Sequence, residues 1–342
     1  MQRIYAPDKE KNRMLKFLYQ NSGIHTRYSV IPDYTRPARE WSFYPPTENL
    51  EPFPTLEERM RLYQQNAGGL SLEAIRRCLD DAGQPISPQS ITHLITVSCT
   101  GMSAPGLDLE LVEALQLPAT IFRTSVNFMG CYAAVHALKL ADALVRSSRD
   151  AKVLIVCTEL CTLHFQQQAS LDNMLSSLLF ADGSAAALVV ADSHKAKGLH
   201  LRHFYSEIAA EGKKEMTWHL SSTGFQMTLT GYVAGLIRAD FGALVENALQ
   251  NSGLQRETIS HWCIHPGGKK ILEAIYKSLS FNNGHLDDSY AVLDQFGNMS
   301  SPTILFVLKR ILDKVNYNQP NCIFGAAFGP GLTMETFIGE TN

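Results

Sequence analysis

The chain has 342 residues, of which 45% are hydrophobic and 18% charged, and its formal net charge at pH 7 is −3. Its 30 basic residues do not outnumber its 33 acidic ones, and no basic run carries interleaved aromatic side chains, so nothing indicates a nucleic-acid binder. No segment approaches the roughly 18 uninterrupted apolar residues of a membrane span, and the first residues lack the apolar core of a signal peptide. These features predict a soluble globular protein without membrane partners.

Cysteine occurs seven times, an odd number for a chain held together by disulfides. Several cysteines lie in apolar, strand-like segments, and none has the paired spacing of a zinc site. We therefore expect free thiols, a cytoplasmic location and no bound metal. The cysteines are Cys78, Cys99, Cys131, Cys157, Cys161, Cys263 and Cys322.

The first 65 residues are polar and have two helical patterns, Lys9–Asn21 and Leu56–Gln65. Between them lies a loop rich in aromatic residues and proline, Pro32 to Pro54. We expect this segment to wrap the surface of the protein, and a loop of this length can also line the entrance to a site.

A different pattern begins at Gly69, where apolar helices and short apolar strands alternate, as is typical of a layered α/β fold. We predict helices over 70–82 and 132–145 and strands over 91–98, 152–158 and 185–191. For the second half we predict helices over 241–250, 269–279 and 302–315 and strands over 259–265 and 322–327.

The second half repeats the order of the first. Aligning Ile259 with Ile91 brings the apolar helix after Gly297 onto the one after Gly130, at a period of about 167 residues, which indicates a duplicated unit. We therefore predict two related halves, 1–195 and 196–342, packed about a pseudo-twofold axis. Equivalent helix starts would face each other near that axis.

This arrangement would bring three chemically useful residues together. Cys131 follows Gly130 at the start of a helix, whose dipole would favour the thiolate. Asn298 occupies the equivalent helix start, and His265 ends a strand of the second half. Taken singly, each has a structural explanation: a buried cysteine, a turn histidine and a helix cap. Jointly, at equivalent points of a repeat, they favour nucleophilic thiol catalysis.

Three motifs resemble the signatures of type III polyketide synthases, the chalcone synthase family. They are Gly297-Asn-Met-Ser-Ser, His265-Pro-Gly-Gly and Phe328-Gly-Pro-Gly-Leu-Thr-Met-Glu-Thr, and the resemblance runs from about Leu56 to Phe337. It implies a thiolase-like fold with duplicated αβαβα halves, a homodimer, and acyl-CoA and malonyl-CoA as substrates without a further cofactor. Cys131 would carry the acyl chain, with His265 and Asn298 as its partners.

The resemblance also assigns residues to the cavity. Phe180 matches a phenylalanine gatekeeper, whereas the second gatekeeper position holds Met227 instead of phenylalanine. Trp218 stands where plant chalcone synthases have glycine, and Ala104 where the family commonly has a methionine that crosses the dimer interface. Thr162, Met216 and Ser300 would shape the elongation cavity, and Arg27, Gly267 and Lys270 would contact CoA.

Several alternatives remain open at this stage. A ketoacyl-ACP synthase III shares the fold and the Cys-His-Asn set, although such enzymes usually have His-Gln-Ala-Asn where this chain has His265-Pro-Gly-Gly. A thiol protease would not explain the repeat, and a catalytically silent scaffold would not need three intact catalytic positions. For the product, the small Ala104 suggests room for a long aliphatic starter and hence an alkylpyrone or alkylresorcinol.

Overall fold

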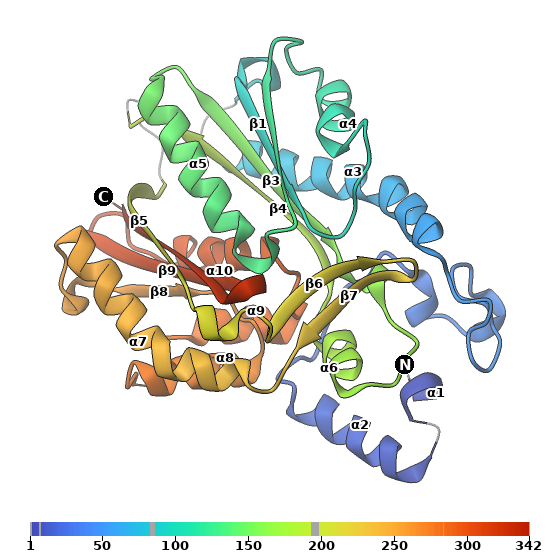
Figure 1. Cartoon of the computed structure of the whole chain (residues 1–342). Helices are drawn as coiled ribbons and strands as arrows, with labels where there is room; N and C mark the ends of the chain where they lie inside the picture. Colours follow the sequence, from blue (N-terminus) through green and yellow to red (C-terminus); the bar gives the residue numbers. More distant parts are fainter. Residues whose placement is uncertain (1, 7, 83–85, 193–197, 283, 342) are drawn as a thin grey trace.

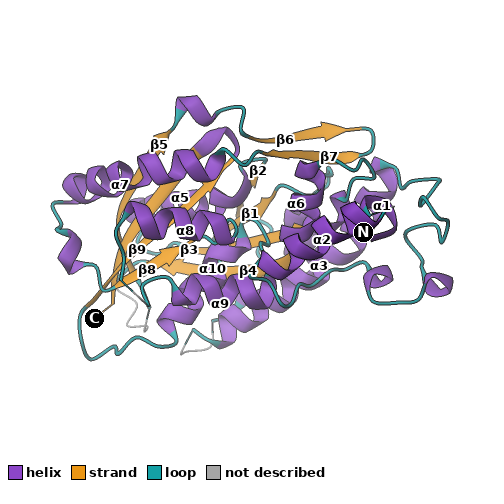
Figure 2. Ribbon diagram, turned by 90° about the horizontal axis from the view of Figure 1, so that it is seen from below, coloured by secondary structure: helices purple, strands orange, loops and turns teal. Residues whose placement is uncertain are grey.

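The computed structural model describes the chain except residues 1, 7, 83–85, 193–197, 283 and 342. Two sheets lie between layers of helices, with a central pair of helices between the sheets (Figures 1 and 2). This is the αβαβα arrangement of the thiolase-like fold that the motifs implied. None of the described helices is long and apolar enough to cross a bilayer.

The first sheet has the strand order β2-β1-β3-β4. β1 runs parallel to both β2 and β3, and β4 is antiparallel to β3. Two helices, α3 and α4, lie on its outer face and share an apolar cluster with it. The elements are α3 (Leu56–Asp80), β1 (His93–Ser98), α4 (Leu107–Ala114), β2 (Phe122–Asn127), β3 (Lys152–Leu160) and β4 (Asp182–Val190).

The second sheet has the order β5-β10-β9-β8. β8 and β9 are parallel, whereas β10 is antiparallel to both β9 and β5. Helices α7 and α8 cover its outer face. The elements are β5 (His200–Ile208), α7 (Val233–Ser252), β8 (His261–Ile264), α8 (Lys269–Ser278), β9 (Asn321–Gly329) and β10 (Thr333–Thr341).

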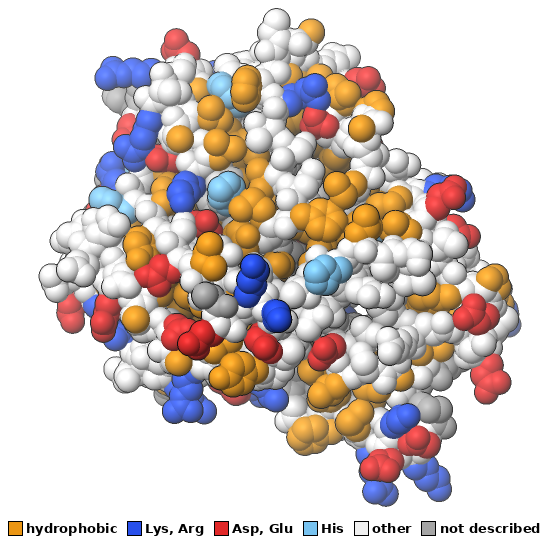
Figure 3. Space-filling model, viewed as in Figure 1, with side chains coloured by type: hydrophobic (Ala, Val, Ile, Leu, Met, Phe, Trp, Pro, Cys, Tyr) orange, Lys and Arg blue, Asp and Glu red, His pale blue; other side chains and the backbone are white. Residues whose placement is uncertain are grey.

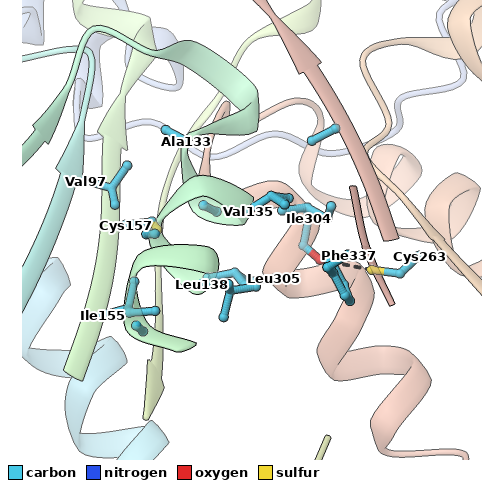
Figure 4. Packing of buried hydrophobic residues seen from close by; sticks show 14 of the residues in the cluster. Val97, Ala133, Val135, Leu138, Ile155, Cys157, Cys263, Ile304, Leu305 and Phe337 are labelled. Atoms are coloured by element: carbon cyan, nitrogen blue, oxygen red, sulfur yellow. Dashed lines mark hydrogen bonds between the residues drawn. The ribbon is translucent and has the colours of Figure 1, made fainter. Parts of the chain in front are cut away.

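The central layer consists of α5 (Ala133–Ser147) and α10 (Pro302–Leu312). Ala133, Val135 and Leu138 of α5 and Ile304 and Leu305 of α10 fill the space between the sheets. Figure 4 shows them between Val97, Ile155 and Cys157 of the first sheet and Cys263 and Phe337 of the second. Because one helix from each half shares this core, neither sheet can bury its inner face without the other half.

The remaining elements surround one end of this core. A hairpin formed by β6 (Met216–Ser221) and β7 (Gly224–Leu229) lies near α6 (Leu171–Leu179), and α9 (Asp287–Phe296) packs against α10. The N-terminal segment begins with α1 (Gln2–Tyr5) and α2 (Lys9–Asn21).

The aromatic loop after α2 wraps the surface, as predicted. The Asp33 carboxylate accepts hydrogen bonds from the backbone N–H groups of Ser42, Phe43 and Tyr44, which folds the loop back on itself. Tyr44 is buried and packs against Phe165 of the first half. The loop is therefore held by its own carboxylate and by aromatic packing.

Two predicted boundaries are wrong. The helix predicted over 241–250 begins at Val233, and the two helices predicted over 56–65 and 70–82 form the single helix α3, which begins with a capping box between Thr55 and Glu58. Gly68 lies inside α3 and serves close packing against α4, because the carboxylate of Glu110 occupies the space where a Cβ would be. Nothing lies within 4 Å of a Cβ on Gly69.

Gly325 allows a test of packing between β9 and β10. A Cβ there would lie 2.0 Å from the ring of Phe337, its fully buried cross-strand partner. We expect Gly325→Ala to lower the free energy of unfolding by about 1–3 kcal/mol through overpacking. Urea unfolding would measure this. The matched control is Gly235→Ala in α7, where nothing lies within 4 Å and alanine should add about 0.5–1 kcal/mol. Equal effects of the two changes would contradict the packing argument.

Candidate active site

A cavity of about 350 Å³ lies where the two halves meet. The first half contributes Cys131, the second half contributes His265 and Asn298, and the N-terminal segment contributes Tyr34. The three residues that the sequence singled out therefore face one enclosed space. The following contacts explain how they are held there.

Cys131 is buried within a 3-10 turn, Gly130–Tyr132, that leads directly into α5. Gly130 has a φ of +77°, and a Cβ on it would lie 2.3 Å from the Pro330 ring. The predicted helix start is confirmed, and glycine is required there by both the backbone angle and the close approach of the neighbouring loop.

That neighbouring loop is the Phe328-Gly-Pro-Gly motif. A Cβ on Gly329 would lie 3.2 Å from the backbone nitrogen of Cys131, so the loop packs directly against the turn that carries Cys131. Phe328 and Pro330 also line the cavity. The loop therefore supports the cavity wall and the cysteine together.

Burial determines the state of the thiol. The Cys131 pKa is raised to about 11, chiefly by burial and further by the nearby Glu159 carboxyl, while a hydrogen bond with Ser300 opposes the rise. The sequence led us to expect that the helix dipole would favour the thiolate, whereas burial shifts the pKa in the opposite direction and favours the protonated thiol.

The thiol faces the start of α10. Cys131 Sγ lies 3.9 Å from Asn298 Oδ1 and 3.5 Å from Ser300 Oγ, although these partners are 167 and 169 positions away in the chain. Asn298 Oδ1 also accepts a hydrogen bond of 2.8 Å from the backbone N–H of Ser300. This bond fixes the amide orientation and leaves the Asn298 NH₂ group as a donor.

His265 is the third member of the group. Its backbone is held to β9 by a 2.9 Å hydrogen bond to the carbonyl of Ala326, but neither ring nitrogen has a hydrogen-bond partner in the described part of the chain. Burial lowers its pKa to about 3. His265 is therefore a neutral imidazole with one donor and one acceptor available to a ligand.

The predicted gatekeeper Phe180 is connected through the backbone to Asn298. Residues 180 and 298 form a parallel bridge, in which the backbone of Asn298 bonds to Leu179 O and Ala181 N. Arg27 donates from Nη1 to the carbonyls of Ser177 and Phe180 at 2.6 and 2.7 Å. Arg27 thus lines the cavity and supports the gate through protein carbonyls.

A second wall comes from the β6–β7 hairpin. Trp218 and Met227 are cross-strand neighbours, and both line the cavity. Trp218 Nε1 donates to the carbonyl of Cys99 at 2.7 Å. The indole is thus held in place at the wall.

His164 braces the same hairpin. Its Nε2 donates to Thr100 O at 2.7 Å, its Nδ1 accepts from the backbone N–H of Phe225 at 3.1 Å, and its ring stacks on Phe225 at 4.2 Å. Burial lowers the His164 pKa to about 3, so the imidazole is neutral with the proton on Nε2. No local pattern in the sequence indicates this role of His164, since a lone histidine after a strand has many uses.

Glu159 is a further residue that the sequence analysis missed. It lies at the end of β3, fully buried, and accepts hydrogen bonds from Cys99 N, Thr100 Oγ1 and Ser301 Oγ at 2.8–2.9 Å. Burial raises its pKa to about 7. The carboxyl ties the end of β1 to the start of α10, and thereby the two halves at the site.

Sequence comparison identifies the family. Residues 5–193 and 200–341 match the models of the N-terminal and C-terminal domains of chalcone and stilbene synthases. The chain belongs to this family. Its members are type III polyketide synthases, so the ketoacyl-ACP synthase III alternative is not supported.

Individual relatives support this family assignment. The chain is 33% identical over 289 residues to an "alpha-pyrone synthesis polyketide synthase-like" protein of Mycobacterium tuberculosis, covering 83% of this chain and 73% of that protein. It is 30% identical over 342 residues to the "probable polyketide synthase 1" of Dictyostelium discoideum, covering 97% of this chain. It spans only 10% of the length of that Dictyostelium protein.

Solved structures have the same fold. PKS-I of the brown alga Ectocarpus siliculosus superimposes with a TM-score of 0.91 at 28% identity, covering 100% of this chain and 92% of that one. The 1,3,6,8-tetrahydroxynaphthalene synthase of Streptomyces coelicolor A3(2) superimposes with a TM-score of 0.87 at 26% identity, covering 99% and 92%.

The structure places most of the predicted site residues of this polyketide synthase at the cavity, but not all of them. Ala104 lies on an exposed loop outside the cavity lining, so it opens no route through the wall within one chain. Lys270 is exposed at the start of α8 and also lies outside. Those that line the cavity are Arg27, Cys131, Thr162, Phe180, Met216, Trp218, Met227, His265, Gly267, Asn298 and Ser300.

Within the described residues, no cluster of three or more His, Cys, Asp or Glu side chains is arranged to hold a metal ion.

The raised pKa of Cys131 predicts how the thiol reacts with iodoacetamide. Because the pKa is about 11, alkylation should accelerate about tenfold per pH unit between about pH 7 and 9, without a plateau. Ser300→Ala removes a hydrogen bond that lowers this pKa, so alkylation should be slower at each pH. Mass spectrometry of the Cys131 peptide gives the rates, with Cys131→Ala as the blank. A plateau below about pH 8 would show a preformed thiolate instead.

Proposed function

We propose that this protein is an active type III polyketide synthase that loads an acyl group from an acyl-CoA starter onto Cys131 and extends it with malonyl-CoA. One observation carries the proposal. A protonated thiol, an imidazole with two unpartnered nitrogens and an oriented amide face one cavity, although they come from both halves of the chain.

Loading requires a base. Cys131 first gives its proton to a ring nitrogen of His265, and the imidazolium and thiolate stabilise each other, which offsets the burial that disfavours both charges. As the sulfur bonds to the thioester carbon of the starter, the bond between that carbon and the CoA sulfur breaks, and His265 returns the proton to the departing CoA sulfur. The Ser300 hydroxyl, which accepts from the thiol at 3.5 Å, can turn to donate to the sulfur once the proton has left.

Extension requires oxyanion donors. When malonyl-CoA loses CO₂, the electron pair of the broken C–C bond moves into the thioester and forms an enolate. His265 and the NH₂ group of Asn298 donate hydrogen bonds to its oxygen. The enolate carbon then attacks the acyl thioester on Cys131, which frees the sulfur and lengthens the chain by two carbons.

We propose that the extended chain cyclises to a pyrone, a resorcinol or a related aromatic product. The mycobacterial relative described as acting in alpha-pyrone synthesis supports the pyrone. The Trp218 side chain occupies part of the cavity, and a larger cavity would accept a longer polyketide. Trp218 therefore limits the number of extensions.

We also propose a homodimer in the cytoplasm. Hydrophobic side chains gather across the middle of the face shown in Figure 3. Met102, Phe122 and Leu220 are each at least 50% exposed. A large exposed apolar area supports an interface between subunits. Seven free cysteines support a reducing compartment.

The decisive experiment follows products and CO₂ separately. With malonyl-CoA and a series of acyl-CoA starters, the wild-type enzyme should give products that contain two or more malonyl-derived units. Cys131→Ala should form no product yet still release CO₂, because both oxyanion donors remain. Asn298→Ala should lower CO₂ release by about 10²–10³-fold.

Two controls separate the alternatives. His265→Gln keeps a donor and should retain more decarboxylation than His265→Ala. A single condensation, or activity only with acyl carrier protein, would contradict the proposal in favour of a fatty-acid type condensing enzyme. Absence of both product and CO₂ release from the wild-type protein with every starter would indicate a silent scaffold.

The Trp218 side chain in the cavity wall should limit the length of the product. Trp218→Gly removes the indole and its hydrogen bond to Cys99, so the mutant should give products at least one malonyl unit longer. Trp218→Phe keeps most of the bulk and should leave the masses unchanged. Mass spectrometry of the products distinguishes the two, and identical masses for all three proteins would show that Trp218 does not limit extension.

A further inference from the structure

The aromatic loop after α2 brings two tyrosines together at the cavity. Its Asp33 carboxylate accepts a hydrogen bond of 2.8 Å from the backbone N–H of Tyr44, which places that residue beside Tyr34. The two rings meet edge to face at 6.1 Å, and their hydroxyl oxygens are 3.3 Å apart. Tyr34 lines the cavity that also holds Cys131, whereas Tyr44 is buried. One phenol thus faces the substrate space, and the other supports it.

A buried cation acts on this pair of phenols. Arg59, in the first turn of α3, has no exposed surface. Its Nε donates to the carbonyl of Pro54 at 3.2 Å, its Nη1 donates to that of Leu163, and its guanidinium lies 4.9 Å from the centre of the Phe53 ring. Its Nη2 has no hydrogen-bond partner among the described residues. The charge is therefore only partly compensated, although both burial and the start of a helix disfavour a cation.

The Arg59 charge gives the hydrogen bond between the phenols a direction. Burial raises the pKa of Tyr44 to about 12, and the positive charge of Arg59 opposes this rise. A phenol near a cation turns its oxygen toward the charge and its hydrogen away from it. Tyr44 is therefore the donor in its bond with Tyr34. The hydrogen of the Tyr34 hydroxyl then remains for a different acceptor.

The protein supplies that hydrogen with only a distant acceptor. The Tyr34 hydroxyl lies 3.4 Å from the carbonyl of Thr162, whereas good hydrogen bonds from a hydroxyl to an oxygen are about 2.5–3.0 Å long. A second hydroxyl at the cavity, that of Ser176 on α6, has no partner among the described residues. Because buried polar groups normally form hydrogen bonds, hydroxyls left open at a cavity indicate a ligand with acceptor oxygens.

The charges around Tyr34 favour a neutral acceptor. Burial holds the pKa of Tyr34 well above its usual value, and the Tyr44 phenol adds to the rise. The Asp182 carboxyl raises this pKa further, while the Arg27 guanidinium lowers it. Tyr34 therefore keeps its proton and acts as a donor. A keto or hydroxyl oxygen suits this donor, whereas a carboxylate would lose its water and add a second negative charge beside Asp182.

We propose that Tyr34, supported by Tyr44 and Arg59, binds a neutral oxygen, a keto or hydroxyl group, on the acyl chain that Cys131 carries. Tyr34 would thereby select among acyl groups through an oxygen of the chain itself, separate from the thioester. A saturated alkyl chain would leave the Tyr34 hydroxyl without a good acceptor and is disfavoured. The inference rests on the proposed loading of Cys131 and adds to it the class of acyl group that the cavity accepts.

Loading of matched starters, without malonyl-CoA, tests this selection. The starters are straight-chain acyl-CoA thioesters of increasing length, each with a methyl end, with a keto group on the penultimate carbon, or with a terminal carboxylate. Mass spectrometry of the Cys131 peptide measures the rate of acylation. At the chain length that reaches Tyr34, the wild-type protein should load the keto form faster than the methyl form. Tyr34→Phe should lower the ratio of these rates about tenfold.

The matched control is Tyr28→Phe. Tyr28 is another phenol that lines the same cavity, and its ring packs against Phe296. This change should leave the ratio of keto to methyl loading as it is in the wild-type protein. An equal loss of the ratio in both variants would show that Tyr34 has no special role and would overturn the proposal.

Three further outcomes would overturn the inference. If Tyr34→Phe leaves the ratio unchanged at every chain length, the phenol binds no oxygen of the chain. Faster loading of the carboxylate form than of the keto form would indicate an anion site instead. Failure of every starter to acylate wild-type Cys131 would contradict the proposed function itself. That failure is distinguishable from the other two outcomes, in which loading proceeds.

A double-mutant cycle tests the support from Tyr44. Tyr44→Phe removes the hydroxyl that donates to Tyr34 but keeps the buried ring, and should lower the same ratio about threefold. The double variant should show no greater loss than Tyr34→Phe alone, because both changes act through one hydrogen bond. Losses that multiply would show that Tyr44 acts independently and would contradict its supporting role. Melting temperatures check that each variant is folded, and if Tyr44→Phe does not fold, Tyr34→Phe still decides.

Discussion

The packing of α5 against α10 between the two sheets is the constraint on which the site depends. Apolar side chains fill the space between the two helices, and α5 presents Ala133, Ala137 and Ala141 to this core, all without exposed surface. Small side chains allow close approach of the helices. The starts of the two helices then meet, and Cys131 faces Asn298 and Ser300 across the junction.

The burial that creates this junction also determines the charges within it. Removal from water raises the pKa of Cys131 and lowers that of His265, so burial favours the neutral form of both groups. A neutral thiol avoids the cost of burying an isolated thiolate. In the mechanism that we propose, charge develops only when a thioester is bound, so the reactivity of the thiol is coupled to occupancy of the cavity.

Several contacts hold in place both the cavity walls and the segments that carry Cys131 and Asn298. Phe180 at the gate is bonded through its backbone neighbours to Asn298. The hairpin with Trp218 and Met227 is tied to Cys99 and Thr100, and Glu159 connects that same segment to the start of α10. A change in the wall can therefore alter the position of the reacting atoms as well as the available volume. For this reason the Trp218→Phe variant, which keeps the bulk of the side chain, is the informative comparison.

The sequence by itself predicted the α/β layers, the repeated order of elements and the meeting of Cys131, His265 and Asn298 at one cavity, because apolar periodicity, glycine positions and the Phe328-Gly-Pro-Gly motif are local features. It also placed Trp218 and Met227 at the cavity through a family resemblance. It misjudged α3 because a glycine pair inside a helix has the same local pattern as a break, and only Glu110 on another helix explains it. It misjudged the Cys131 thiol because the helix dipole can be inferred from sequence, whereas burial depends on what packs around the sulfur. Tertiary structure alone decided the roles of His164 and Glu159 and the exposure of Ala104, since each depends on residues that are distant in the chain.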